Sequence, residues 1–166
     1  KNAARIFLDL LLNHGNPGRA LRRMNELGML AKFIPEIEPI VAMMQFNMYH
    51  HYTVDEHTIQ CITHLAQIER RELEEELPIA SNILDEGLNR KVLYVALLLH
   101  DIGKGRDEDH AILGARIARK VAPRLGLDKA ESDTVEWLVR YHLLMSDMAQ
   151  KRDISDPRTI RDFAKA

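Results

Sequence analysis

The sequence of 166 residues has one cysteine, Cys61, and few aromatic residues, which make up 5% of the chain. One cysteine cannot form an internal disulfide framework or a thiolate zinc cage, and it fits a reducing compartment, with the cytoplasm as the default. No charge sign dominates, because 23 Lys and Arg stand against 25 Asp and Glu. We therefore expect no general attraction to nucleic acid or anionic lipid.

Long hydrophobic runs are also missing. The strongest run, 92–99, falls short of the roughly 18 apolar residues needed to span a bilayer, so it predicts a buried helix and no membrane partner. The chain begins at Lys1 rather than Met, and residues 1–12 lack the cleavage site of a signal peptide. We expect a piece of a longer protein.

Hydrophobic residues recur at helical spacing, whereas the alternation typical of strands is lacking, so the sequence predicts an all-α fold. Residues 1–48 are expected to form a small helical N-terminal lobe, packed on a helical domain of residues 49–166. The last helix is still under way at Ala166, so we expect the domain to continue further. Start and stop signals predict helices at 2–14, 17–28, 54–71, 90–99, 110–125, 128–141 and from 157 onward.

Individual residues define several of these boundaries. Thr53 and Glu56 fit a capping box at the start of the third helix. The stretch 78–87 indicates a connection, while Trp137 and the face of the first helix that carries Ile6 are expected in the core. Further helix starts with capping side chains are expected at Asn89, Asp109 and Asp128.

The sharpest feature is the pair His100 and Asp101, at the end of the most apolar predicted helix. A buried ionised carboxylate costs several kcal/mol unless it is paired or binds a metal. The pair alone is equally compatible with a helix-terminal histidine beside a capping aspartate. However, His57, His110 and His142 also lie at predicted helix ends, which can converge on one point in a bundle.

Neutral imidazoles with a carboxylate suit manganese, magnesium, zinc or iron, and a bridging carboxylate can hold two ions that activate water toward a phosphoester. Lys104, beside two glycines, is expected to neutralise phosphoryl oxygens as a catalytic group. Arg106 and His51 are predicted substrate contacts. For each of these three side chains, an exposed position or a local structural role is the alternative.

The pattern of His57 with the run HDIGKG at 100–105 resembles the HD superfamily of metal-dependent phosphohydrolases. The similarity is closer to the HD domain of the bacterial bifunctional uridylyltransferase/uridylyl-removing enzymes. It covers nearly the whole chain. The runs that carry it are YHHYTVDEHT at 49–58, HDIGKGR at 100–106 with DH at 109–110, YHLLMSD at 141–147, RDISDP at 152–157, and LRRMN at 21–25 with GML at 28–30.

This resemblance implies a set of metal ligands. His57, His100 and Asp101 would hold one ion, and Asp101 would bridge to a second ion held by His110 and His142. The last ligand of the superfamily is an aspartate on a late helix, expected here beyond residue 166, with Asp147 as the nearest substitute. The expected cofactor is one or two divalent ions, Mn²⁺ or Mg²⁺ first and Zn²⁺ or Fe as alternatives.

The same resemblance implies hydrolysis of the phosphodiester between UMP and a tyrosine of the nitrogen-regulatory PII protein. Asp101 and Lys104 would be the catalytic residues. A nucleotidyltransferase domain before this region and ACT domains after it are the implied partners in the full-length chain. Two alternatives stay open: an HD hydrolase acting on a free nucleotide, and a catalytically silent regulatory module.

Overall fold

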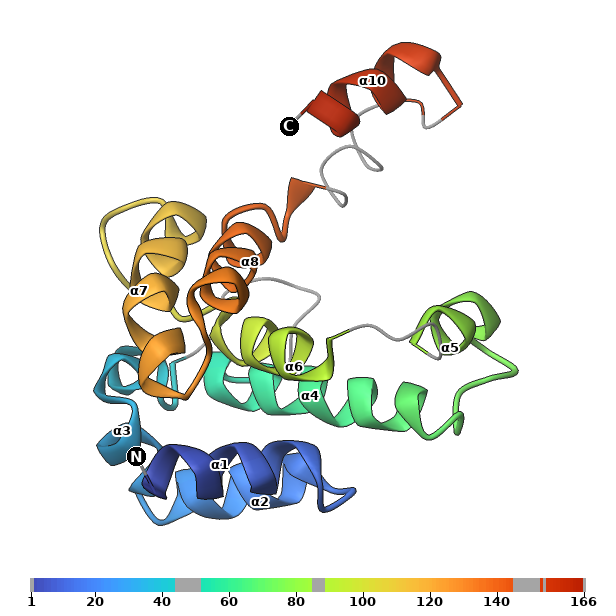
Figure 1. Cartoon of the computed structure of the whole chain (residues 1–166). Helices are drawn as coiled ribbons and strands as arrows, with labels where there is room; N and C mark the ends of the chain where they lie inside the picture. Colours follow the sequence, from blue (N-terminus) through green and yellow to red (C-terminus); the bar gives the residue numbers. More distant parts are fainter. Residues whose placement is uncertain (1, 44–51, 85–88, 145–152, 154, 166) are drawn as a thin grey trace.

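The computed structural model describes residues 2–43, 52–84, 89–144, 153 and 155–165, and every regular element in these ranges is a helix (Figure 1). The all-α prediction is confirmed, and none of the described helices is long and apolar enough to cross a membrane. The elements are α1 (Asn2–Leu12), α2 (Pro17–Glu26), α3 (Met29–Phe33), η1 (Pro35–Ile40), α4 (Val54–Glu69), α5 (Pro78–Leu84), α6 (Arg90–Leu99), α7 (His110–Arg124), α8 (Lys129–Arg140) and α10 (Pro157–Lys165).

Polar side chains begin the three helices that lead to and from the site. Asn89 and Asp109 accept backbone N–H groups in the first turns of α6 and α7, and Asp128 forms a capping box at the start of α8. These bonds satisfy donors that a helix start leaves unpaired. Because α6 leads into His100 and α7 begins at His110, the caps also determine where those two histidines lie.

The capping box predicted at the start of α4 does not form. The helix begins where expected, but the Thr53 side chain makes no capping hydrogen bond to it. The Glu56 carboxylate instead accepts a hydrogen bond from Nη2 of Arg22 in α2 at 2.7 Å, which directs it toward α2. Asn25 of α2 also donates to Asp55 at 2.8 Å. Both bonds tie the N-terminal helices to α4.

Helix α6 lies in the middle of the bundle, as its nearly all-round apolar sequence predicts (Figure 1). It packs against α4, α8 and α1, while α7 packs along α8 and α2 along α4. Beyond the end of α6, Asp101 and Ile102 are also buried. The chain therefore enters the site from inside the core. The predicted boundary after residue 48 falls outside the described residues and stays a prediction.

Three details of the sequence-based expectation are wrong. The stretch 78–87 contains α5, because proline at a first helical position favours a helix start. Trp137 is 52% exposed, and the face of α8 that packs inward carries Val135 and Val139 instead. The buried face of α1 carries Phe7 and Leu11, which leaves Ile6 56% exposed.

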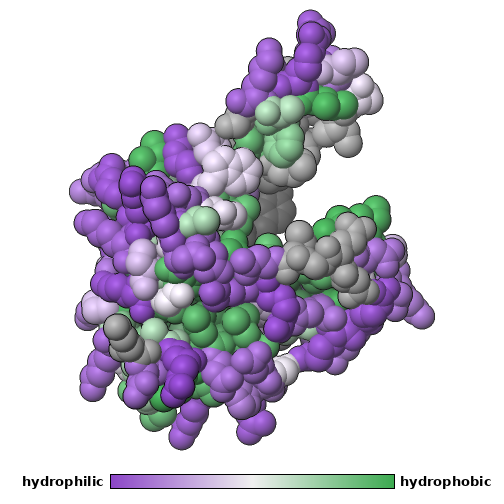
Figure 2. Space-filling model, in the orientation of Figure 1, coloured by the Kyte–Doolittle hydropathy of each residue, from purple (hydrophilic) through white to green (hydrophobic). Residues whose placement is uncertain are grey.

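Hydrophobic residues also reach the surface on α5 and α10 (Figure 2). Ile79 of α5 is 74% exposed and Ile160 of α10 is 58% exposed. In the part of the chain that the structure describes, Thr159 is the buried residue of α10. These two helices thus contribute little to the core that supports the site.

Candidate metal centre

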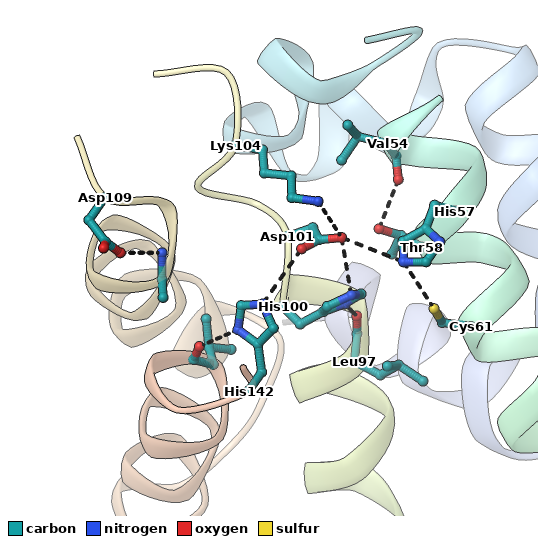
Figure 3. A network of polar contacts seen from close by, with 12 residues as sticks. Val54, His57, Thr58, Cys61, Leu97, His100, Asp101, Lys104, Asp109 and His142 are labelled. Carbon is teal, nitrogen blue, oxygen red and sulfur yellow. Dashed lines mark hydrogen bonds and ion pairs between the residues drawn. The ribbon is translucent and has the colours of Figure 1, made fainter. Parts of the chain in front are cut away.

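The ends of four helices meet at the C-terminal end of α6 (Figure 3). His57 lies in the first turn of α4, His100 caps α6 and Asp101 follows it, His110 begins α7, and His142 follows α8. Neighbouring rings in the order 57, 100, 142, 110 have centroid distances of 5.8, 5.4 and 5.8 Å. The structure therefore brings together five of the six residues proposed as metal ligands.

The Asp101 carboxylate lies at the centre of this cluster, with its side chain 4% exposed (Figure 3). Its Oδ2 is 3.1 Å from Nε2 of His100 and 3.8 Å from Nε2 of His57. Its Oδ1 is 3.7 Å from Nε2 of His142. The two oxygens thus face different histidines, which is the arrangement needed for a carboxylate to bind two ions. The Nζ of Lys104 lies 3.5 Å from Oδ2.

Backbone carbonyls orient two of the imidazole rings. Nδ1 of His100 donates to the carbonyl of Leu97 at 2.5 Å, and Nδ1 of His142 donates to the carbonyl of Val139 at 2.7 Å. Because a carbonyl can only accept, Nδ1 carries the hydrogen in both rings. In the neutral ring the lone pair is then on Nε2, which faces Asp101. Metal-binding histidines in proteins are held in the same way.

Charges within the cluster compensate one another. Burial raises the pKa of Asp101, but its hydrogen bond to His100 and the charges of His100 and Lys104 outweigh burial and hold that pKa well below its usual range. Burial lowers the pKa of His100, but its hydrogen bond to Asp101 and the charge of Asp101 outweigh burial, so the pKa of His100 is raised. Burial lowers the pKa of His142. An ionised carboxylate and a neutral His142 are the protonation states that bind a cation.

Among the described residues, the donor atoms fall into two sets of three, and within each set all atoms lie within 4.8 Å of one another. Nitrogen, oxygen and sulfur donors at this spacing suit a divalent first-row ion. We call them the carboxylate set and the thiol set. Their members are Asp101, His110 and His142 in the carboxylate set, and His57, Cys61 and His100 in the thiol set.

Cys61 is the member that the sequence patterns did not single out. Its Sγ lies 3.6 Å from Nε2 of His57, one helical turn earlier on α4. Burial, together with the charge of Asp101, raises the pKa of the Cys61 thiol. The spacing of four residues between histidine and cysteine was the available signal, because it places both side chains on one face of a helix.

The other proposed site residues are placed differently. Lys104 joins the cluster through Asp101. The Nη2 of Arg106 donates to the carbonyl of Glu36 in η1 at 3.3 Å, so this guanidinium is directed toward the N-terminal helices. His51 and Asp147 lie outside the described residues. The proposed roles of Arg106, His51 and Asp147 stay predictions.

Close backbone packing holds the two ends of the loop between α6 and α7. A Cβ atom on Gly103 would overlap the carbonyl oxygen of His110 and would lie 2.6 Å from the backbone N of Gly114. Glycine is therefore required for this approach. The contact places Asp101, two residues before Gly103, at a fixed position relative to His110.

The structure is an all-α bundle whose helix ends bring together several histidines and an adjacent His-Asp pair. These features place the chain in a class of helical domains that bind metal ions. The family model described as "HD domain" matches residues 54–165, and the chain belongs to this family. The match begins with α4 and includes every member of both donor sets.

Three similar proteins within this class share the name bifunctional uridylyltransferase/uridylyl-removing enzyme. Identity is 82% over 166 residues to that of Ruegeria pomeroyi, 78% over 166 residues to that of Cereibacter sphaeroides, and 55% over 161 residues to that of Azospirillum brasilense. These matches cover 100%, 100% and 97% of the chain but only 18%, 18% and 17% of the relatives. The resemblance drawn from the sequence is confirmed, for one part of these longer enzymes.

Proposed function

We propose that the chain is the uridylyl-removing part of such an enzyme, a metal-dependent hydrolase that releases UMP from uridylylated PII protein. The observation that carries this proposal is the buried Asp101 carboxylate, whose two oxygens face the histidines of two donor sets. The name of the relatives supports the uridylyl group as the part removed. The sequence resemblance supports PII, with tyrosine as its modified residue.

In this proposal Asp101 would be a ligand of two divalent ions. His57 and His100 would hold one of them, and His110 and His142 the other. Mn²⁺ or Mg²⁺ is the expected cofactor, with Zn²⁺ or Fe as alternatives. Such ions supply Lewis acidity toward phosphoryl oxygens and make water a nucleophile near neutral pH.

Water adds to phosphorus in the proposed reaction, and the bond from phosphorus to the tyrosine oxygen breaks. The products are UMP and the unmodified protein, which regains its hydroxyl proton. Lys104 would stabilise negative charge on the phosphoryl oxygens, because its ammonium lies beside Asp101 in a mostly buried cluster. The backbone hydrogen bonds of His100 and His142 keep both rings oriented throughout.

The surroundings of this site are also part of the proposal. Residues 1–48 would form a lobe on the HD domain of residues 49–166, and the full-length chain would add nucleotidyltransferase and ACT domains. The name of the relatives supports a uridylyltransferase activity in the longer protein. A cytoplasmic location is supported by the single cysteine, and nucleic acid is no part of the expected substrate.

UMP release from uridylylated PII in the presence of Mn²⁺, together with Mn²⁺ stoichiometry by equilibrium dialysis, tests the proposal. Asp101→Asn should abolish ion binding and reduce UMP release by more than about 100-fold, since even residues that only support a metal ligand cost 10- to 100-fold. Asp133→Asn changes an exposed aspartate of α8 and should leave both readouts unchanged.

Both substitutions should be repeated in a full-length relative at the matching positions. UMP release that survives Asp101→Asn there would contradict the assigned site. Hydrolysis of guanosine tetraphosphate or deoxynucleotides in preference to uridylylated PII would keep the site but replace the substrate. Absence of both ion binding and hydrolysis in this chain and in the full-length relative would favour the silent regulatory module, whereas recovery of both in the full-length relative would show that a ligand beyond residue 166 completes the site.

A further inference from the structure

The thiol of Cys61 lies inside the ion-binding cluster. Its Sγ is 3.6 Å from Nε2 of His57 on the same helix, and His100 approaches from α6 (Figure 3). His57 Nε2 also lies 3.8 Å from Oδ2 of Asp101. A donor nitrogen of each of two imidazoles and the Cys61 sulfur thus lie within 4.8 Å of one another between α4 and the end of α6.

The distance between Sγ of Cys61 and Nε2 of His57 is the distance expected for two ligands of one ion. A tetrahedral zinc ion with bonds of about 2.3 Å to sulfur and about 2.05 Å to nitrogen places those two atoms about 3.6 Å apart. The observed Sγ–Nε2 distance is 3.6 Å. A hydrogen bond from the thiol to the imidazole has the same length, so the experiment below must separate these two possibilities.

We propose that Cys61 is a metal ligand, and that the thiol set therefore prefers a zinc-like ion while the carboxylate set takes a harder ion such as Mn²⁺. Thiolate ligands select softer ions, whereas a carboxylate suits Mn²⁺ and Mg²⁺. Binding exchanges the S–H bond for a bond from sulfur to the ion and releases the proton to solvent. The inference rests on the proposed function because both use the same cluster of side chains. It adds that the two sets would bind chemically different ions.

Co²⁺ is the probe for this proposal, because a thiolate bound to Co²⁺ gives a charge-transfer absorption band that nitrogen and oxygen ligands do not. Wild-type protein titrated with Co²⁺ should show the band, and Cys61→Ser and Cys61→Ala should lack it. His110→Ala, which removes a member of the carboxylate set only, should keep it. Circular dichroism verifies that each variant retains its helices.

The chain has one cysteine, so its reaction with a thiol reagent reports on Cys61 alone. Zn²⁺ should slow modification by at least about tenfold in the wild type, because a thiolate that binds the ion is not available as a nucleophile. His57→Ala should remove this protection and His110→Ala should retain it.

Two results would overturn the proposal. Two bound Co²⁺ ions per chain without a charge-transfer band would show that the thiol only hydrogen-bonds to His57. Bound Zn²⁺ that leaves the modification rate unchanged would have the same meaning. Neither result touches the proposed hydrolysis, whose own readout is UMP release. Failure to bind any ion would overturn both proposals.

Discussion

The thiol set and the carboxylate set share one neighbourhood but are built in different ways. His57 and Cys61 occupy one face of one helix, and His100 joins them from α6. The carboxylate set has no such shared helix, since Asp101, His110 and His142 follow or begin three different helices. Helical periodicity therefore positions much of the first set, whereas the second depends on how loops and helix ends are held.

Gly103→Ala should have the largest effect, and it should act on the carboxylate set. The new Cβ would overlap the backbone oxygen of His110 and approach the backbone N of Gly114, neither of which can turn aside as a side chain can. We expect a loss of more than about 3 kcal/mol in the free energy of unfolding, at the upper end of overpacking. Urea denaturation measures it, and Mn²⁺ binding should weaken.

Gly114→Ala is the matched control for this change. Its Cβ would meet the end of the Val139 side chain at 3.2 Å, and the gain in helix propensity of about 1 kcal/mol offsets that contact. We expect stability close to that of the wild type. Equal losses in the two variants would show that the loop backbone does not position the carboxylate set.

Lys104→Met comes next and tests whether the Lys104 ammonium acts on the reaction or only supports the site. Its Nζ lies beside Oδ2, the oxygen that also faces His57 and His100. If Lys104 stabilises charge in the transition state, kcat for UMP release should fall by about 100-fold, while two ions stay bound. Lys104→Arg keeps the charge and should recover part of the rate. Loss of bound ions in Lys104→Met would instead assign Lys104 a structural role.

The comparison of the two sets also explains what the sequence could predict. Local chemistry at Asn89, Asp109 and Asp128 predicted the starts of α6, α7 and α8, and with them the helix ends that carry His100 and His110. Interactions that depend on tertiary partners were not predictable in this way. The Glu56 carboxylate satisfied a capping pattern by sequence, but Arg22 binds it in the folded chain.

Two other features, the position of Trp137 and the role of Cys61, were not predictable from hydrophobicity or residue counts. Trp137 is large and apolar, yet the packed face of α8 is filled by Val135 and Val139, which leaves the indole at the surface. A single cysteine argues against a zinc cage made of thiolates, but it says nothing against one thiol among histidines. The position of Cys61 one turn after His57 was the informative feature, and composition alone did not reveal it.

The smallest expected effect concerns the tie between α4 and α6, the two helices that carry the thiol set. Burial, with the nearby carboxylate of Glu69, raises the pKa of Tyr94 to about 12. An unfolded tyrosine ionises near pH 10, so neutral, buried Tyr94 contributes stability that is complete below pH 10. That stability is lost as the pH rises from about 10 to about 12.

Tyr94→Phe removes the ionising group and leaves the ring that packs in the core. The wild type should therefore lose about 2 kcal/mol relative to Tyr94→Phe over this pH range, as measured by urea denaturation at several pH values. At neutral pH the two proteins should differ by less than about 1 kcal/mol, because the bond from Tyr94 to Glu69 is long, at 3.4 Å. A stability difference that stays constant with pH would contradict this, because it would mean that Tyr94 has the same pKa in the folded and the unfolded protein.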